Sequence, residues 1–179
     1  MTLSPEDIVS NFEKYRSFIE KLGDRAPAAL QLVDHLGEKL AMCPASSRNE
    51  WHNAFAGGLV DHSLRVLTNA MRLCKAYGWD IPRDSLIVAA LLHDIGKVGF
   101  VGDDGEVVDY YVPQESEWHR EKLGENYKKN KGMPYLTTRD RSIHLCQHFG
   151  LKLKKNEYLS ILLNDGFILD ENKIGRAHV

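Results

Sequence analysis

Two adjacent residues that can bind a metal, His93 and Asp94, follow an uninterrupted apolar run at 86–92. An ionised carboxylate in apolar surroundings is costly unless a cation or a hydrogen-bonding partner compensates it. Imidazole nitrogen and carboxylate oxygen suit Mn, Fe, Co, Ni or Zn, and also Mg where oxygens and water dominate. We therefore predict a divalent metal ion, of open identity, at His93 and Asp94. Gly96 is expected to permit a tight turn after the helix.

The chemistry expected of such a site is hydrolysis, because a bound divalent ion lowers the pKa of its water and neutralises phosphoryl charge. Asp94 is the first catalytic candidate, since it can both bind the metal and orient the attacking water. Lys97 is the second, because its ammonium follows closely in the chain and can hold a phosphate. The sequence contains no glycine-rich P-loop, no G-x-G-x-x-G and no G-x-S-x-G, so nothing favours those chemistries.

His62 interrupts the apolar stripe of a helix expected at about 59–77 and should therefore point inward. An isolated inward histidine is more often a hydrogen-bonded core residue than a ligand. The pairing with His93 and Asp94 on another buried helix reverses this preference, because converging ligands serve a metal and not a core.

These motifs resemble the HD-domain superfamily of metal-dependent phosphohydrolases, whose pattern is H…HD…D on an all-helical scaffold. The segment 51–66, W-H-N-A-F-A-G-G-L-V-D-H-S-L-R-V, is followed by L-L-H-D-I-G-K. The segment 51–66 is similar to a subgroup with H-H-x-x-x-G-G-L-x-x-H-S/T-L. In this chain Asn53 stands in place of the second histidine of that pattern. The resemblance covers about residues 50–165. It implies that His62, His93 and Asp94 bind the metal, and Asp165 is the best candidate for the closing aspartate.

Several candidates extend this set, each with an alternative. Asp165 with Gly166 could simply form a turn. A second metal could be held by three further histidines, although such residues also line polar pockets; they are His119, His144 and His148. His52 is expected to contact substrate, or else to cap a loop. The remaining candidates for holding a substrate phosphate are Lys97, Arg120 and Lys122.

These side chains must be positioned by helices, because helical spacing dominates the sequence. We predict an all-α fold, a compact HD-domain helical bundle with one small β-hairpin inserted near 98–113 around Asp104-Gly105. The expected helices lie at about 5–22, 27–40, 59–77, 85–95, 116–129, 138–149 and 156–164.

The predicted domain is a single one over 1–173. The last six residues, 174–179, read Ile-Gly-Arg-Ala-His-Val and look like one reading frame of a sequencing-adapter oligonucleotide. We expect them to be a non-native tail on a domain that is truncated at its C-terminus; the alternative is a natural tail.

Composition limits the class of protein further. The 179 residues are 43% hydrophobic and 27% charged, which excludes collagen-like and mostly disordered chains. Lys plus Arg number 23 and Asp plus Glu 25, a net charge of −2 that gives no global attraction to nucleic acid or anionic membranes. Three cysteines without metal-type spacing predict reduced thiols and a cytoplasmic protein. The basic stretch 120–155 could attract phosphate or be a solvated helix face.

The function predicted from these features is metal-dependent hydrolysis of a phosphate ester, in a nucleotide or another small phosphorylated metabolite. One alternative is a phosphodiesterase with a two-metal site that acts on cyclic nucleotides or RNA ends. Another is a non-catalytic regulatory module that binds metal or nucleotide. The expected partner is a small phosphorylated substrate, with no membrane; nucleic acid is not favoured, and a homo-oligomer is left open.

Overall fold

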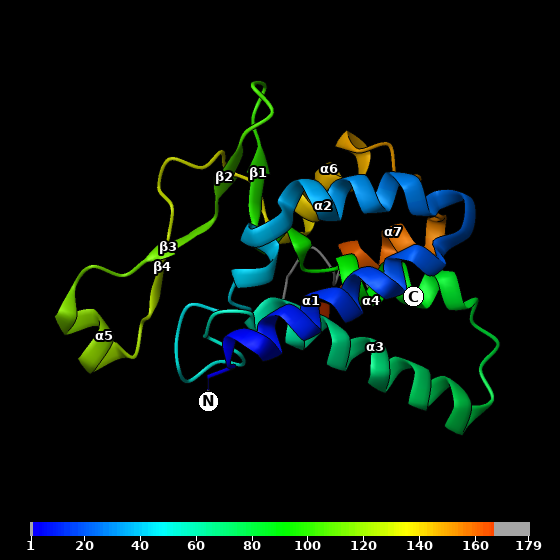
Figure 1. Cartoon of the computed structure of the whole chain (residues 1–179), viewed down its shortest axis with the longest axis horizontal. Coiled ribbons are helices and arrows are strands. Elements are labelled where there is room, and N and C mark those ends of the chain that lie inside the picture. Colours follow the sequence, from blue (N-terminus) through cyan, green and yellow to red (C-terminus); the bar gives the residue numbers. More distant parts are fainter. Residues whose placement is uncertain (1, 167–179) are drawn as a thin grey trace, which may run out of the picture.

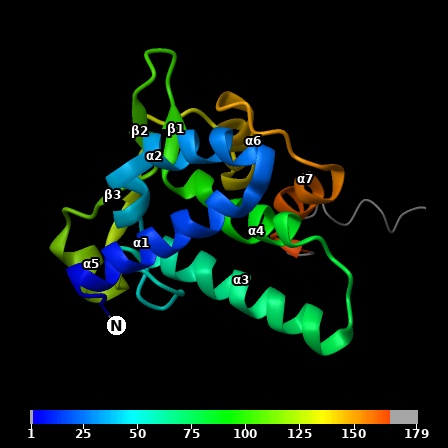
Figure 2. The ribbon, with the colours of Figure 1, turned by 45° about the vertical axis from the view of Figure 1, so that its right-hand side comes forward.

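Helices form the body of the protein and surround α4 (Arg83–Leu92), as Figures 1 and 2 show. The computed structural model describes residues 2–166. Two short 3-10 segments, η1 and η2, complete the helical set. The remaining bounds are α1 (Pro5–Ile19), η1 (Glu20–Arg25), α2 (Ala26–Met42), α3 (Gly58–Tyr77), η2 (Ile95–Lys97), α5 (Glu117–Leu123), α6 (Thr138–His148) and α7 (Lys155–Leu162).

The helix α4 is buried on most of its surface, as its apolar sequence predicts. Its buried residues are Ile87, Val88, Ala90, Leu91 and Leu92, and it packs against α1, α3 and α7. The hydroxyl of the buried Tyr15 on α1 donates to the carbonyl oxygen of Leu91 over 2.7 Å. This bond satisfies a carbonyl at the end of α4 that the helix itself leaves without a partner.

Capping residues define the N-terminal starts of two other helices. A reciprocal capping box starts α1, since the Ser4 side chain accepts from the Asp7 amide while Asp7 binds the Ser4 amide. Thr137 and Asp140 form the same arrangement at the start of α6. The second of these caps fixes where α6 begins, next to the turn that carries Asp94.

The predicted hairpin is present: β1 (Gly99–Val101) pairs antiparallel with β2 (Val107–Asp109). A second antiparallel pair, β3 (Tyr111–Pro113) with β4 (Tyr127–Lys129), was not predicted. The expected helix at 116–129 is wrong in its second half, because Gly124 adopts a left-handed conformation (φ 58°) and ends α5. The all-α assignment holds, with two small sheets in place of one. Figure 1 shows α5 at the outer end of an arm formed by β3 and β4.

The three cysteines are free thiols in the structure. Cys43 and Cys146 are buried, and Cys74 is partly exposed. Burial raises the pKa of Cys146 to about 12.

Within residues 2–166 no helix combines the length and apolar character needed to cross a membrane. The suspected tail at 174–179 and the predicted domain end at 173 lie outside the described residues, so these two predictions stay as they are.

Candidate metal centre

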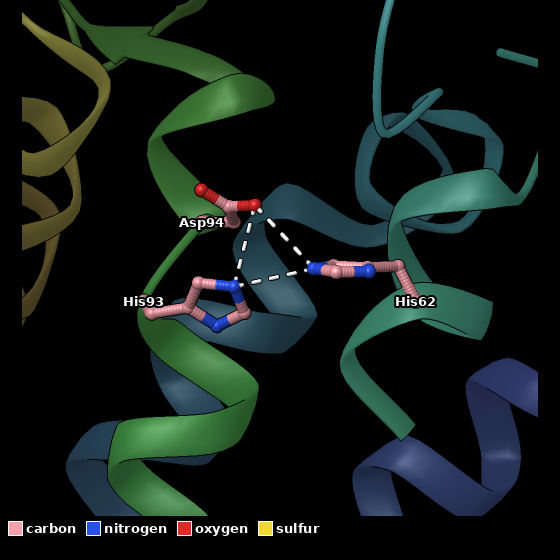
Figure 3. A group of neighbouring side chains, drawn as sticks. All are labelled: His62, His93 and Asp94. Carbon is pink, nitrogen blue, oxygen red and sulfur yellow. Dashed lines mark hydrogen bonds and ion pairs between the residues drawn. The ribbon is translucent and has the colours of Figure 1, made fainter. Parts of the chain in front are cut away.

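Three predicted ligands meet between α3 and the end of α4. His62 projects from α3, and His93 and Asp94 follow α4 directly (Figure 3). The Nε2 atoms of His62 and His93 lie 3.3 Å apart. The Oδ2 atom of Asp94 lies 3.3 Å from His93 Nε2 and 3.7 Å from His62 Nε2. Among the described residues, these form the one group of three His, Cys, Asp or Glu side chains compact enough to hold an ion.

The spacing of these donor atoms fits a divalent metal ion. Bonds of about 2.0–2.2 Å to one ion place neighbouring ligand atoms about 3–3.5 Å apart. Two imidazole nitrogens and one carboxylate oxygen suit a first-row divalent ion such as Mn, Fe, Co, Ni or Zn. Three protein ligands also leave coordination positions for water and substrate.

The two histidines direct their Nε2 atoms to this point. His93 Nδ1 lies 3.0 Å from the Ala90 carbonyl oxygen, so Nδ1 can keep a proton there while Nε2 offers its lone pair to a metal ion. Burial lowers the pKa of His62 to about 4. Its ring is therefore neutral at pH 7, which is the state that binds metals.

Asp94 stays ionised although it is only 7% exposed. Burial by itself would raise its pKa, but the hydrogen bond and charge of His93, together with those of Lys97, outweigh burial and hold the pKa well below its usual range. Lys97 Nζ donates to Asp94 Oδ2 over 2.7 Å. The ammonium thus lies beside the ligand cluster, as its position in the sequence predicts.

The cluster lies at a cavity of about 350 Å³. His52 lies on one wall, with its ring centroid 4.6 Å from that of His62. Burial and, next, the charge of Lys97 lower the pKa of His52. Asp165 is exposed and lines the same cavity, just beyond α7, but does not belong to the compact group of three. The cavity is also lined by Val66, Thr138 and Asn164, which sequence reasoning missed.

The turn that carries Asp94 is held by α6. Gly96 lies so close to α6 that an added Cβ would come within 2.2 Å of the Thr138 carbonyl oxygen. Its φ is not left-handed. The expected reason for this glycine, a tight turn, is therefore corrected: the residue is small because α6 touches it. The Ser142 hydroxyl accepts from the Gly96 amide over 2.9 Å, and Arg141 Nε donates to the Gly96 carbonyl over 2.6 Å.

Arg141 is one of two buried cations in the basic stretch at 120–155, most of whose other basic residues are exposed. It is only 2% exposed, and its guanidinium lies 3.9 Å from the ring centre of Tyr110. Arg139 is buried as well, at 8% exposed. These two cations are part of the packing and do not form a solvated face. Their inward direction could have been found only from the helical phase relative to the buried Leu145 and Cys146.

The structure does not bring the α5 candidates to the metal cluster. Figure 1 places α5 at the end of the arm, well away from α4. His119 Nδ1 lies 2.7 Å from the Ser116 hydroxyl at the start of α5. Arg120 is exposed and donates to the Gln114 carbonyl oxygen, and Lys122 is exposed.

His144 and His148 lie together on α6, as their spacing predicts, with ring centroids 6.0 Å apart. His144 stacks on Phe100 of β1 at 4.7 Å, and His148 contacts Phe149. Neither joins the ligand cluster among residues 2–166. A second metal site built on these histidines therefore gains no geometric support.

Asn53, which stands where the resembling subgroup has a histidine, has a structural place here. It adopts a left-handed φ of 52°, and its amide donates to the Gly58 carbonyl oxygen and to Asp61. Gly58 must be glycine, because an added Cβ would lie 2.1 Å from the Asn53 carbonyl oxygen. The contact between Asn53 and Gly58 holds the loop that carries His52 against the start of α3.

A family model of the HD domain matches residues 59–160, more than half of the chain. The chain therefore belongs to the HD-domain family, which confirms the resemblance. The finer subgroup suggested by segment 51–66 stays a prediction.

Two curated relatives are similar to parts of this chain. One is a dihydroneopterin 2',3'-cyclic phosphate phosphodiesterase of Methanocaldococcus jannaschii, 32% identical over 108 residues, which are 58% of this chain and 42% of the relative. The other is the 3'-5' exoribonuclease YhaM of Oceanobacillus iheyensis, 41% identical over 61 residues, 34% of this chain and 18% of the relative. The chain thus spans less than half the length of either. No solved structure matches it significantly.

Proposed function

We propose that this protein is a metal-dependent hydrolase that cleaves a phosphate ester bond. The observation that carries the proposal is the convergence of His62, His93 and Asp94 at the wall of a 350 Å³ cavity. Its volume lies in the range of roughly 300–1,000 Å³ that is usual for pockets that bind small ligands. A divalent ion held there supplies an acidified water and stabilises charge on the phosphoryl oxygens.

The surrounding side chains take the roles that their positions allow. His62, His93 and Asp94 hold the ion, and Asp94 also accepts a hydrogen bond from the attacking water. Lys97 binds a phosphoryl oxygen as a point charge, since its ammonium is next to the cluster and faces the cavity. His52, neutral at pH 7, donates its ring N–H to the substrate. Asp165 remains the candidate for a fourth ligand, supported by its place on the cavity wall.

We further propose that the substrate is a phosphodiester of nucleotide type, with a 2',3'-cyclic phosphate as the first candidate. Both curated relatives are named for cleaving phosphodiesters, and the cyclic phosphate phosphodiesterase matches the larger share of this chain. Water adds to phosphorus, one P–O ester bond breaks, and the freed oxygen takes up a proton. We favour one metal ion, because His119, His144 and His148 lie outside the cluster.

The test is hydrolysis of three substrates by the full chain with added Mn²⁺: a nucleoside 2',3'-cyclic phosphate, a single-stranded RNA oligonucleotide and a nucleoside monophosphate. We expect the cyclic phosphate to be opened and His93→Ala to lose this activity at least 100-fold. Cleavage of RNA alone would favour the exoribonuclease alternative. Bound metal without hydrolysis of any substrate would contradict the enzyme and favour a binding module.

A further inference from the structure

A second cavity of about 310 Å³, with both polar and apolar lining, lies between α1 and α3 and is lined by residues that contribute nothing to the metal cluster. From α3 it receives Arg65, Thr68, Asn69 and Arg72, whose spacing i, i+3, i+4 and i+7 places them on one helix face. From α1 it receives Asn11 and Lys14, which are three residues apart and share a face in the same way. We refer to this cavity as the α1–α3 groove.

Positive charge exceeds negative charge in the α1–α3 groove. Asp61 is the one carboxylate among its described lining residues, and it pairs with Arg65 at 3.0 Å. No described carboxylate forms an ion pair with Lys14 or Arg72 within 4.0 Å. Two cations therefore face the groove without a neutralising partner in the described part of the chain.

Part of the uncharged lining adds hydrogen-bond donors to these cations. Asn11 and Asn69 offer amide N–H groups. The Thr68 hydroxyl donates its proton to the Leu64 carbonyl oxygen over 2.8 Å and therefore presents only an acceptor, and Leu64 is an apolar part of the lining. Arg65 is fixed in place, because Nη2 donates to Asn53 Oδ1 over 2.5 Å as well as pairing with Asp61. A pre-oriented guanidinium loses little conformational entropy when it binds an oxyanion.

We propose that the α1–α3 groove is a binding site for a small ligand that carries two phosphate groups. Arg65 and Arg72 are two helical turns apart, about 10 Å along the axis of α3, and Lys14 reaches the groove from the opposite wall. A single phosphate would engage one end of this arrangement, whereas a diphosphate engages cations from both helices. The site is independent of the proposed hydrolysis, since none of its lining residues lines the cavity at the metal cluster.

The test is a calorimetric titration with inorganic pyrophosphate at physiological ionic strength. The full chain carries Asp94→Ala and Lys97→Ala, so that neither a metal ion nor the Lys97 ammonium holds the anion at the metal cluster. We expect saturable binding of one pyrophosphate per chain, weakened at least tenfold by Lys14→Gln with Arg72→Gln. Both residues are exposed, so the pair should fold, which circular dichroism checks. Lys75→Gln, an exposed cation of α3 outside the groove, should leave the affinity unchanged.

Two results would overturn the proposal. One is the absence of saturable binding to the Asp94→Ala, Lys97→Ala chain; if the wild-type chain does bind, the anion belongs to the metal cluster only. The other is equal affinity in the Lys14→Gln, Arg72→Gln chain and the Lys75→Gln chain, which would reduce the effect to general surface charge. Neither result bears on hydrolysis, because the readout is binding in a chain without the Asp94 carboxylate.

Discussion

One oxygen of Asp94 faces two histidines and a lysine. Lys97 Nζ, His93 Nε2 and His62 Nε2 lie 2.7, 3.3 and 3.7 Å from the same Oδ2. Lys97 makes the shortest of these contacts, and together with His93 it compensates the buried carboxylate. A divalent ion at the cluster would take over this compensation, and the ammonium of Lys97 would then be available to a substrate phosphate. We therefore expect Lys97 to bind the substrate phosphate and not to be needed for metal binding.

The change Lys97→Ala tests this division. We expect kcat/KM for phosphate ester hydrolysis to fall roughly 10- to 100-fold, which corresponds to about 1.4–2.7 kcal/mol of lost transition-state stabilisation, with metal content unchanged. Lys131→Ala, an exposed lysine outside the cavity, is the matched control and should match the wild type. Loss of metal in Lys97→Ala would show instead that Lys97 positions Asp94.

At the scale of elements, the cavity at the metal cluster is lined in part by Thr138 of α6 and by Asn164 and Asp165, which follow α7. Helix α6 fixes the turn after α4 through Gly96, and α7 ends just before Asp165. Ion pairs hold α7 against η1. The side chain of Glu157 on α7 is 1% exposed and accepts two hydrogen bonds from the Arg25 guanidinium of η1, at 2.7 and 3.0 Å. The Ser85 hydroxyl of α4 donates to the same carboxylate over 2.8 Å.

The change Glu157→Gln should lower the free energy of unfolding by about 3 kcal/mol at pH 7, because it leaves Arg25 partly buried without its main partner. The loss is measured by urea denaturation. Glu115→Gln is the matched control, since its ion pair with Lys128 is exposed and should contribute less than about 0.5 kcal/mol.

The contribution of Glu157 to stability should depend on pH. Burial would raise the pKa of Glu157, but its bonds with Arg25, the Lys154 amide and Ser85 lower it on balance. Its stabilisation is therefore complete above the pKa of the unfolded chain, about 4.3, and is lost as pH falls through the lower folded pKa. The difference in stability between wild type and Glu157→Gln should shrink below pH 4. A difference that stays constant from pH 7 to pH 3 would contradict this assignment.

At the scale of the whole molecule, metal binding and folding should be linked, because His62 and the His93–Asp94 pair come from different helices that meet only in the fold. Mn²⁺ at 100 times its dissociation constant should raise the free energy of unfolding by about 2.7 kcal/mol. Thermal unfolding with and without Mn²⁺ measures this. Asp94→Ala should show a much smaller shift, and an equal shift in both chains would place the binding elsewhere.

The sequence predicted those parts of the whole molecule that depend on local patterns. Helical phase placed His62 inward, and the apolar run before His93 predicted the buried α4. The second sheet was missed because β3 and β4 are three residues each and pair across α5. The closeness of α6 to Gly96 was also hidden, since it depends on packing between segments about 45 residues apart. Arg120 and Lys122 were expected at the site because of their side-chain types, and side-chain type does not show in which direction the arm that carries α5 extends.

The most direct test of the central claim is the metal content of the purified full chain and of Asp94→Ala, measured by elemental analysis after incubation with Mn²⁺ and removal of free ions. The account predicts about one divalent ion per wild-type chain and close to none in Asp94→Ala. The same metal content in both chains, or no metal in the wild type, would contradict a metal centre at His62, His93 and Asp94.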